Sequence, residues 1–188
     1  MAVLSYLQDT VNTIKIADWE RTTIETSIGT LATKLGKHFG DTLNTKFVFG
    51  SFDRRTILRR SKDSNSDVDY MVVFNDGSEY RPQTLMTRLK TFAEANYSKN
   101  EIYQSSPTIV LELSNIKFEL APAYKDFWGT YFIPAPASDY ADWIETDPKK
   151  IKDDLEQKQK DNNYLIRDLV LLMKYWNVKN GKVYSSYN

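Results

Sequence analysis

The chain has 188 residues, a formal net charge of zero, 41% hydrophobic and 27% charged residues, no cysteine and a single histidine, His38. These numbers predict one domain, or one domain with part of a second, and exclude a uniformly basic nucleic-acid-binding chain, disulfides, thiol catalysis and a cysteine- or histidine-rich metal site. Because no apolar run is long enough to span a membrane and no signal peptide opens the sequence, we expect a cytoplasmic protein with no membrane partner.

The first forty residues predict two amphipathic helices, or one helix that is broken in the middle. Apolar residues recur at helical spacing over 2–18 and again over 20–39. Gly36 and Gly40 are typical of the end of a helix.

Two strands and a helix are predicted next. The sequence TKFVFG at 45–50 is typical of a short strand, and SDVDYMVVF at 66–74 is typical of a strand that becomes fully buried. NDGS at 75–78 predicts a turn, and the segment from Pro82 to Tyr97 predicts a helix that begins at its proline.

The segment 108–124 predicts an antiparallel hairpin with one buried face. A two-residue turn at Ser114–Asn115 places apolar and polar residues in strict alternation on both arms. The predicted buried face holds Ile109, Leu111, Leu113, Ile116, Phe118 and Leu120, and the other face holds Thr108, Val110, Glu112, Lys117 and Glu119.

The rest of the chain predicts an irregular connection over 129–148, a solvated charged stretch over 149–161 and an apolar helix over 164–178. The predicted fold class is α+β, a mixed sheet flanked by helices. We expect residues 1–148 to form the core, with the N-terminal helices packed on it, and 149–188 to form the truncated beginning of a helical domain.

Asp67 and Asp69 are the strongest candidates for chemistry. In a strand, residues two apart point to the same face, so these two carboxylates project together while Val68 points into the core. Two adjacent carboxylates repel each other unless a cation lies between them. Hard carboxylate oxygens suit Mg²⁺, which keeps phosphate oxygens and waters as its other ligands.

Two-metal sites for phosphoryl transfer commonly need a third carboxylate from a neighbouring strand. Glu119 on the predicted hairpin could supply it, and Glu112 on the same face is a rival. Upstream, Gly50 and Ser51 offer a tight turn whose backbone N–H groups and hydroxyl could hold a phosphate.

These residues, in this order, resemble the polymerase-beta-type nucleotidyltransferase superfamily, and within it the cGAS-like and oligoadenylate-synthase-like bacterial CD-NTases. That pattern is Gly-Ser, a spacer, Asp-x-Asp on a strand and a third acidic residue on a later strand. The local matches are GSFDRRT from residue 50, FELAPAY from residue 118, LLMKYWN from residue 171 and SSY from residue 185. Glu119 departs from the pattern, since aspartate is usual there.

The resemblance implies a nucleotidyltransferase that uses nucleoside triphosphates and makes a cyclic or linear oligonucleotide second messenger in anti-phage signalling. It implies catalytic and metal-binding roles, with two Mg²⁺ ions or Mn²⁺ as a substitute, for Asp67, Asp69 and Glu119. It implies nucleotide-binding roles for Gly50, Ser51, Lys174, Ser186 and Tyr187, with Tyr187 stacking on the donor base. A nucleic-acid or protein regulator is a further expected partner.

The basic run Arg54, Arg55, Arg59 and Arg60 has two interpretations, a solvated loop or a surface that attracts phosphates. Two alternative functions also stay open. The chain could modify a protein or tRNA, as toxin–antitoxin nucleotidyltransferases do, or it could be a nucleotide-binding module that has lost turnover.

Overall fold

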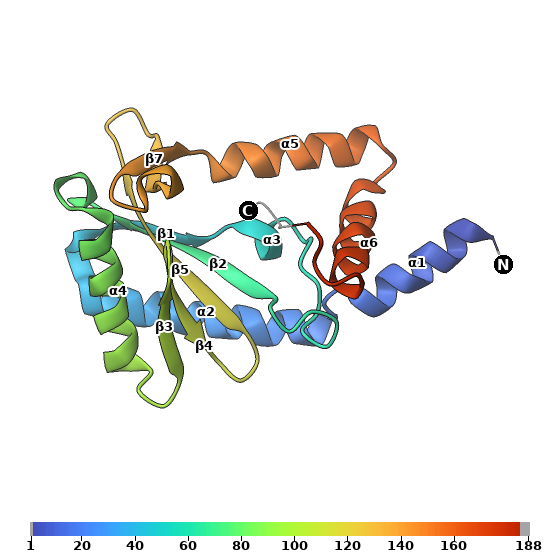
Figure 1. Ribbon diagram of the computed structural model, residues 1–188, viewed down its shortest axis with the longest axis horizontal. Coiled ribbons are helices and arrows are strands. Elements are labelled where there is room, and N and C mark those ends of the chain that lie inside the picture. Colours follow the sequence, from blue (N-terminus) through green and yellow to red (C-terminus); the bar gives the residue numbers. More distant parts are fainter. Residues whose placement is uncertain (1, 185–188) are drawn as a thin grey trace.

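The computed structural model describes residues 2–184 of the chain (Figure 1). The helices are α1 (Val3–Ile14), α2 (Asp18–Phe39), α3 (Gly50–Asp53), α4 (Pro82–Asn96), α5 (Pro148–Asp161) and α6 (Ile166–Lys179). The strands are β1 (Leu43–Val48), β2 (Asp67–Phe74), β3 (Glu101–Ser105), β4 (Thr108–Glu112), β5 (Lys117–Lys125), β6 (Tyr131–Pro134) and β7 (Trp143–Thr146). Short 3₁₀ turns cover Gly40–Thr42, Gly77–Glu79 and Pro136–Ser138.

A single mixed sheet forms the centre of the molecule. Its strands lie in the order β1-β2-β5-β4-β3, and β6 pairs with β5 and β7. The pair β2–β5 is parallel and the other pairs are antiparallel. The two central strands, β2 and β5, are therefore held in one fixed parallel register, and this register positions the candidate site.

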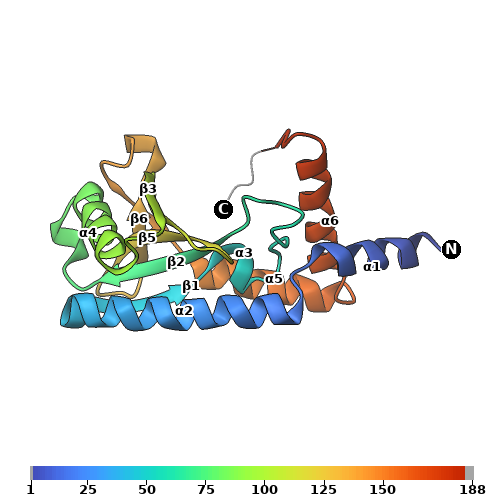
Figure 2. The same ribbon diagram turned by 90° about the horizontal axis from the view of Figure 1, so that it is seen from below.

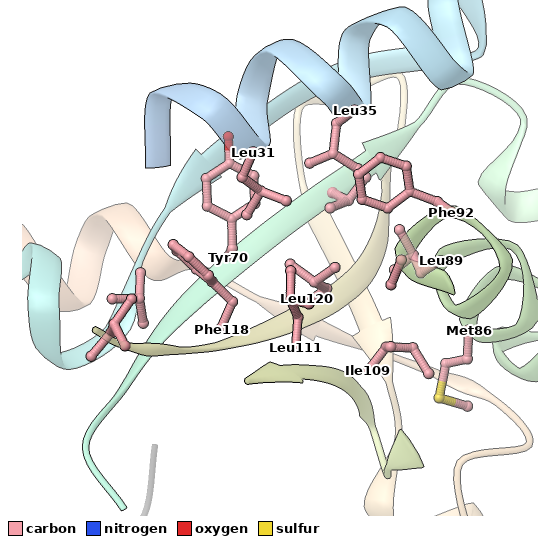
Figure 3. Packing of buried hydrophobic residues seen from close by; sticks show 14 of the residues in the cluster. Leu31, Leu35, Tyr70, Met86, Leu89, Phe92, Ile109, Leu111, Phe118 and Leu120 are labelled. Carbon is pink, nitrogen blue, oxygen red and sulfur yellow. The ribbon is translucent and has the colours of Figure 1, made fainter. Parts of the chain in front are cut away.

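Helices α2 and α4 cover one face of this sheet, and the main core lies beneath them (Figure 3). Strand β2 sends alternate residues into this core, beginning with Val68 and Tyr70, which are almost completely buried. The labelled side chains in Figure 3 come from both helices and three strands and point toward one another: Leu31, Leu35, Tyr70, Met86, Leu89, Phe92, Ile109, Leu111, Phe118 and Leu120.

The opposite face of the sheet carries a smaller apolar cluster. Met71 and Val73 of β2 and Ala123 of β5 are buried there against Tyr131 of β6. Because residues two apart share a face, Asp67 and Asp69 lie on this side of β2, away from α2 and α4. The main core and the acidic residues thus occupy opposite faces of the same strand.

Helix α6 packs in a third apolar cluster, separate from the main core. Leu171 packs with Val11 and Ile14 of α1 and with Leu58 of the loop before β2. Figures 1 and 2 both show α1 and α6 side by side at one end of the molecule, beyond the sheet.

Local sequence explains where two of the helices begin. Pro82 and Pro148 occupy the first turns of α4 and α5, where the missing backbone N–H has no intrahelical partner to lose. At α5, the Asp147 side chain also accepts a hydrogen bond of 3.0 Å from the Lys150 N–H and caps the helix.

Most predicted elements are confirmed, including the two N-terminal helices, the hairpin and the mixed sheet flanked by helices. The hairpin turn closes with the Leu113 N–H donating to the Ile116 carbonyl at 2.9 Å. The prediction of an irregular segment over 129–148 is wrong, because β6 and β7 form a second hairpin there. Strand β3 was not predicted, and the first strand ends at Val48 rather than at Gly50.

Within residues 2–184, no helix combines the length and the apolar character that crossing a bilayer requires. The division between residues 148 and 149 stays a prediction.

Candidate active site

The parallel register of β2 and β5 brings the predicted acidic residues together. Asp69 lies beside Glu119, and Asp67 lies beside Lys117. Since paired residues on adjacent strands share a face, the three carboxylates and one ammonium form a cluster at one end of the two central strands. Val68, between the aspartates, is fully buried on the other face, as the alternation predicts.

Lys117 is the residue of this cluster to which the sequence assigned no role. Its Nζ lies 3.3 Å from Asp67 Oδ2 and 3.0 Å from Glu119 Oε1. Two clues were visible in the sequence: Lys117 is two residues before Glu119 on the same strand face, and it is on the hairpin arm nearest the site. What the sequence did not give was the register that places it opposite Asp67.

The positive charges near Asp67 and Asp69 do not fully compensate for the burial and mutual repulsion of the carboxylates. Burial, followed by the carboxylates of Asp69 and Glu119, raises the pKa of Asp67 to about 7, and the Lys117 ammonium only partly opposes this. The site therefore disfavours the charged form of Asp67 unless a cation compensates for it.

Asp69 is the more buried of the pair, with only 4% of the residue's surface exposed. Burial and then Glu119 raise its pKa to about 6, while the Ser51 backbone N–H, Arg54 and Lys174 lower it. Among the described residues, its Oδ2 atom has no hydrogen-bond partner. A buried carboxylate oxygen without a hydrogen-bond partner lowers the stability of the folded state, and a bound cation would compensate for it.

Gly50 and Ser51 form the first turn of the short helix α3 and approach Asp69 closely. Gly50 has φ +68°, and a Cβ built there would lie 1.8 Å from Asp69 Oδ2. Only glycine fits this position, because any side chain would collide with the carboxylate. The predicted Gly-Ser turn is thus packed directly against the predicted Asp-x-Asp strand.

Lys174 of α6 joins the cluster from outside the sheet. It lines the same pocket, of about 450 Å³, as Ser51, Asp67 and Lys117. Burial lowers the pKa of Lys174, and so does Arg54, while Asp67 and Asp69 raise it. The structure therefore brings together residues from the Gly-Ser turn, from both central strands and from α6.

The predicted residues Ser186 and Tyr187 lie outside the described residues. Tyr184, for which the sequence predicted no role, lines the pocket. Its backbone N–H donates a 3.0 Å hydrogen bond to Asn177 Oδ1 of α6. The chain is therefore held at the pocket's edge up to residue 184.

The rival acid Glu112 is tied elsewhere, because it forms an ion pair with Arg60. Arg59 likewise pairs with Glu20 of α2 at 2.9 Å. Within the basic run, Arg59 and Arg60 thus connect the loop between α3 and β2 to α2 and to β4. Arg55 lines a separate pocket between α2, α3 and α5. The Arg54 guanidinium lowers the pKa of both Asp69 and Lys174, so Arg54 fits the phosphate-attracting interpretation.

Among residues 2–184, no group of three acidic or histidine side chains is positioned to coordinate a metal ion in this conformation. Lys117 lies between two of the three acids. The donor set nevertheless fits a hard divalent cation, since it offers carboxylate oxygens that are buried, mutually repelling and incompletely paired.

Comparison with known proteins places this geometry in a family. The family model described as "Second Messenger Oligonucleotide or Dinucleotide Synthetase domain" (SMODS) matches residues 1–159, which include the Gly-Ser turn and all three acids. The chain belongs to the SMODS family. The resemblance to bacterial CD-NTases is thereby confirmed.

A curated relative of this SMODS chain is the "Probable cyclic nucleotide synthase IK1_05630" of Bacillus cereus. It is 25% identical over 176 residues, covering 74% of this chain and 51% of the relative. This chain therefore spans about half the length of the curated relative.

Solved structures share the fold of this SMODS chain. Vibrio cholerae DncV in its 3'-deoxy GTP bound form matches with a TM-score of 0.76 at 10% identity, over 94% of this chain and 65% of DncV. The E. coli MS115-1 CdnC:HORMA-deltaN complex matches with a TM-score of 0.72 at 14% identity, over 98% of this chain and 59% of that one. The predicted nucleotidyltransferase fold is confirmed by both.

Proposed function

We propose that this chain carries the catalytic core of a metal-dependent nucleotidyltransferase that joins nucleotides from nucleoside triphosphates into a cyclic or linear second messenger. The observation that carries the proposal is the buried, under-neutralised Asp67–Asp69 pair, packed against a Gly-Ser turn in a SMODS chain. The predicted role in anti-phage signalling is part of the same proposal.

Asp67, Asp69 and Glu119 would hold two Mg²⁺ ions, with Mn²⁺ as a substitute. When bound, such ions activate an attacking hydroxyl and neutralise the charge that develops on the transferred phosphate. The fit rests on Asp69 Oδ2, which lacks a hydrogen-bond partner among the described residues, and on the raised pKa values of both aspartates.

The pocket beside these acids suits a triphosphate. The Ser51 hydroxyl and the Lys174 ammonium both border it, and a lysine binds phosphate as a point charge. The names of related structures support nucleotide binding: Elizabethkingia meningoseptica CdnE is described with GTP and Apcpp, and E. coli CdnC with ATP. The CdnC:HORMA-deltaN complex supports a protein regulator as a further partner.

A labelled-nucleotide assay tests the reaction. The protein is incubated with each α-³²P-labelled nucleoside triphosphate and Mg²⁺, and small products and macromolecules are separated. We expect a small phosphatase-resistant product that Asp67→Ala and Asp69→Ala abolish, whereas Asp154→Ala, an exposed change on α5, leaves it intact.

Two results would contradict the proposal. Activity that survives in both aspartate variants would place the metal site elsewhere. Label that appears only on protein or RNA would favour the alternative acceptor, a macromolecule, over a second messenger.

A further inference from the structure

A lysine occupies the place between two of the proposed metal ligands. Lys117 Nζ contacts Asp67 Oδ2 at 3.3 Å and Glu119 Oε1 at 3.0 Å, and only 14% of its side chain is exposed. Both carboxylates are themselves largely shielded, at 21% and 20% exposure. This is a shared, mostly buried ion pair rather than a solvated surface contact.

The backbone fixes this arrangement. Lys117 precedes Glu119 by two residues on β5, so both side chains leave the same face of the sheet. The parallel register then sets Lys117 directly opposite Asp67 on β2. The ammonium is thus built into the acidic cluster by strand pairing and does not arrive from a mobile loop.

A divalent ion that binds Asp67 and Glu119 together must compete with this ammonium. Like charges a few ångströms apart repel strongly where solvent is largely excluded. The ammonium satisfies two of the three acids but leaves Asp69 Oδ2 without a partner among the described residues. Lys117 therefore substitutes for a metal ion only in part.

Lys117 also borders the pocket in which a triphosphate is proposed to bind. It lines the pocket of about 450 Å³ together with Ser51 and Lys174, the residues proposed to hold the triphosphate. A triphosphate placed there would offer the ammonium new oxygens at the moment when its hold on the carboxylates must be released.

We propose that Lys117 is a positioning residue that couples metal binding to nucleotide binding. Without nucleotide it pairs with Asp67 and Glu119 and weakens the binding of a divalent ion. With a triphosphate in the pocket its ammonium transfers to the phosphates, and the two carboxylates become available to the metal. This inference rests on the proposed function of the site.

The test measures Mn²⁺ binding directly, by the loss of the free-ion electron paramagnetic resonance signal, with and without a non-hydrolysable ATP analogue. For Lys117→Met we expect the dissociation constant for Mn²⁺ alone to fall by about tenfold, because a competing charge has been removed. The nucleotide should then strengthen Mn²⁺ binding less than it does in the wild type.

Two variants serve as controls, and a third serves as a replacement for the test variant. Lys117→Arg keeps the charge and should bind Mn²⁺ alone as weakly as the wild type. Lys125→Met makes the same substitution at the other end of β5, where the side chain lies over the Tyr131 ring, and should also match the wild type. Lys117→Gln replaces Lys117→Met if circular dichroism shows that the methionine variant does not fold.

The outcomes separate the inference from the function on which it rests. Unchanged or weaker binding of Mn²⁺ alone to a folded, neutral Lys117 variant overturns the coupling role. If Asp69→Asn binds Mn²⁺ as well as the wild type, or if no variant binds it even with nucleotide, the proposed metal site itself is wrong and the inference falls with it.

Discussion

At the scale of single residues, the contact between Gly50 and Asp69 determines the shape of the site. The glycine has a positive φ, and a Cβ added to it would overlap the Asp69 carboxylate. The Ser51 backbone N–H can approach Asp69 closely because the preceding position carries no side chain. The Gly-Ser pair is therefore a steric requirement as well as a sequence pattern.

Gly50→Ala should damage both stability and the site. We expect the free energy of unfolding to fall by roughly 1–3 kcal/mol, because the new Cβ adopts an unfavourable φ and must push Asp69 aside. Urea unfolding measures the change. Gly29→Ala is the matched control, since its Cβ meets nothing within 4 Å in α2, and it should stabilise by roughly 0.5–1 kcal/mol. Equal effects in the two variants would contradict the steric account.

The raised pKa of Asp69 predicts a pH-dependent cost to folding. Its pKa is about 6 in the folded protein against 3.8 as the ordinary value. The folded state therefore favours the protonated form, and the stability it contributes is fully present below about pH 4 and is lost as the pH rises through 6.

Asp69→Asn removes this cost. In EDTA, the free energy of unfolding of the variant relative to the wild type should increase between pH 4 and pH 7 by on the order of 2 kcal/mol, then level off. Urea unfolding across that range measures it. A difference that does not vary with pH would show that the buried carboxylate is already neutralised by Lys174, Arg54 and the Ser51 N–H.

At the scale of secondary-structure elements, α6 is held in place by an arginine that does not line the pocket beside the acids. The Arg167 Nε donates to the Arg54 carbonyl at 3.0 Å, its guanidinium pairs with Glu156 of α5, and its backbone N–H donates to Gln159 Oε1 at 2.9 Å. Arg167 thereby links α6, which carries Lys174, to α5 and to the residue after α3.

Arg167→Leu should weaken nucleotide binding from a distance. We expect a loss of about 1–3 kcal/mol in the free energy of unfolding, because charged hydrogen bonds in a half-buried setting are broken. The dissociation constant for Mg²⁺-ATP should rise several-fold as Lys174 loses its alignment. Calorimetric titration tests this, with Lys160→Leu on the exposed face of α5 as the control. Unchanged affinity would mean that α6 docks mainly through Leu171 and its apolar neighbours.

The strands differ in how well they could be predicted from the sequence. The hairpin over β4 and β5 was predictable because one face alternates strictly and its turn is short. Strand β3 was not, since each of its residues except Ile102 is exposed and no apolar alternation marks it. The β6–β7 hairpin was concealed by its prolines and aromatic residues, although its strands pair regularly from Tyr131 to Pro134.

The candidate site shows the same limit. Asp67, Asp69, Glu119 and the Gly-Ser turn were predictable from local pattern and order along the chain. The position of Lys117 opposite Asp67 and the ion pair of Glu112 with Arg60 were not, because both depend on which segments are adjacent in the fold. Pairing between strands distant in sequence is a tertiary property that local alternation does not encode.

At the scale of the whole molecule, stability and chemistry are placed on opposite faces of one sheet. Helices α2 and α4 bury the large apolar core on one face, and the acids lie on the other face. Ser51 of α3 and Lys174 of α6 line the pocket beside these acids. The extensive core can compensate for the free-energy cost of the repelling carboxylates.

The central claim is that Asp67, Asp69 and Glu119 bind divalent metal together with a nucleoside triphosphate in the pocket bordered by Ser51 and Lys174. The most direct measurement is the shift in thermal unfolding temperature on titration with ATP, GTP, CTP and UTP, each with and without Mg²⁺. The wild type is compared with Asp69→Asn and with the exposed control Asp154→Asn.

A ligand that binds only the folded state stabilises it by mass action, so a hundredfold excess over the dissociation constant should raise the unfolding temperature by about 5–10 °C. We predict such a shift for at least one nucleotide, dependent on Mg²⁺, absent in Asp69→Asn and retained in Asp154→Asn. A shift of equal size in Asp69→Asn, or one that needs no Mg²⁺, would contradict the account.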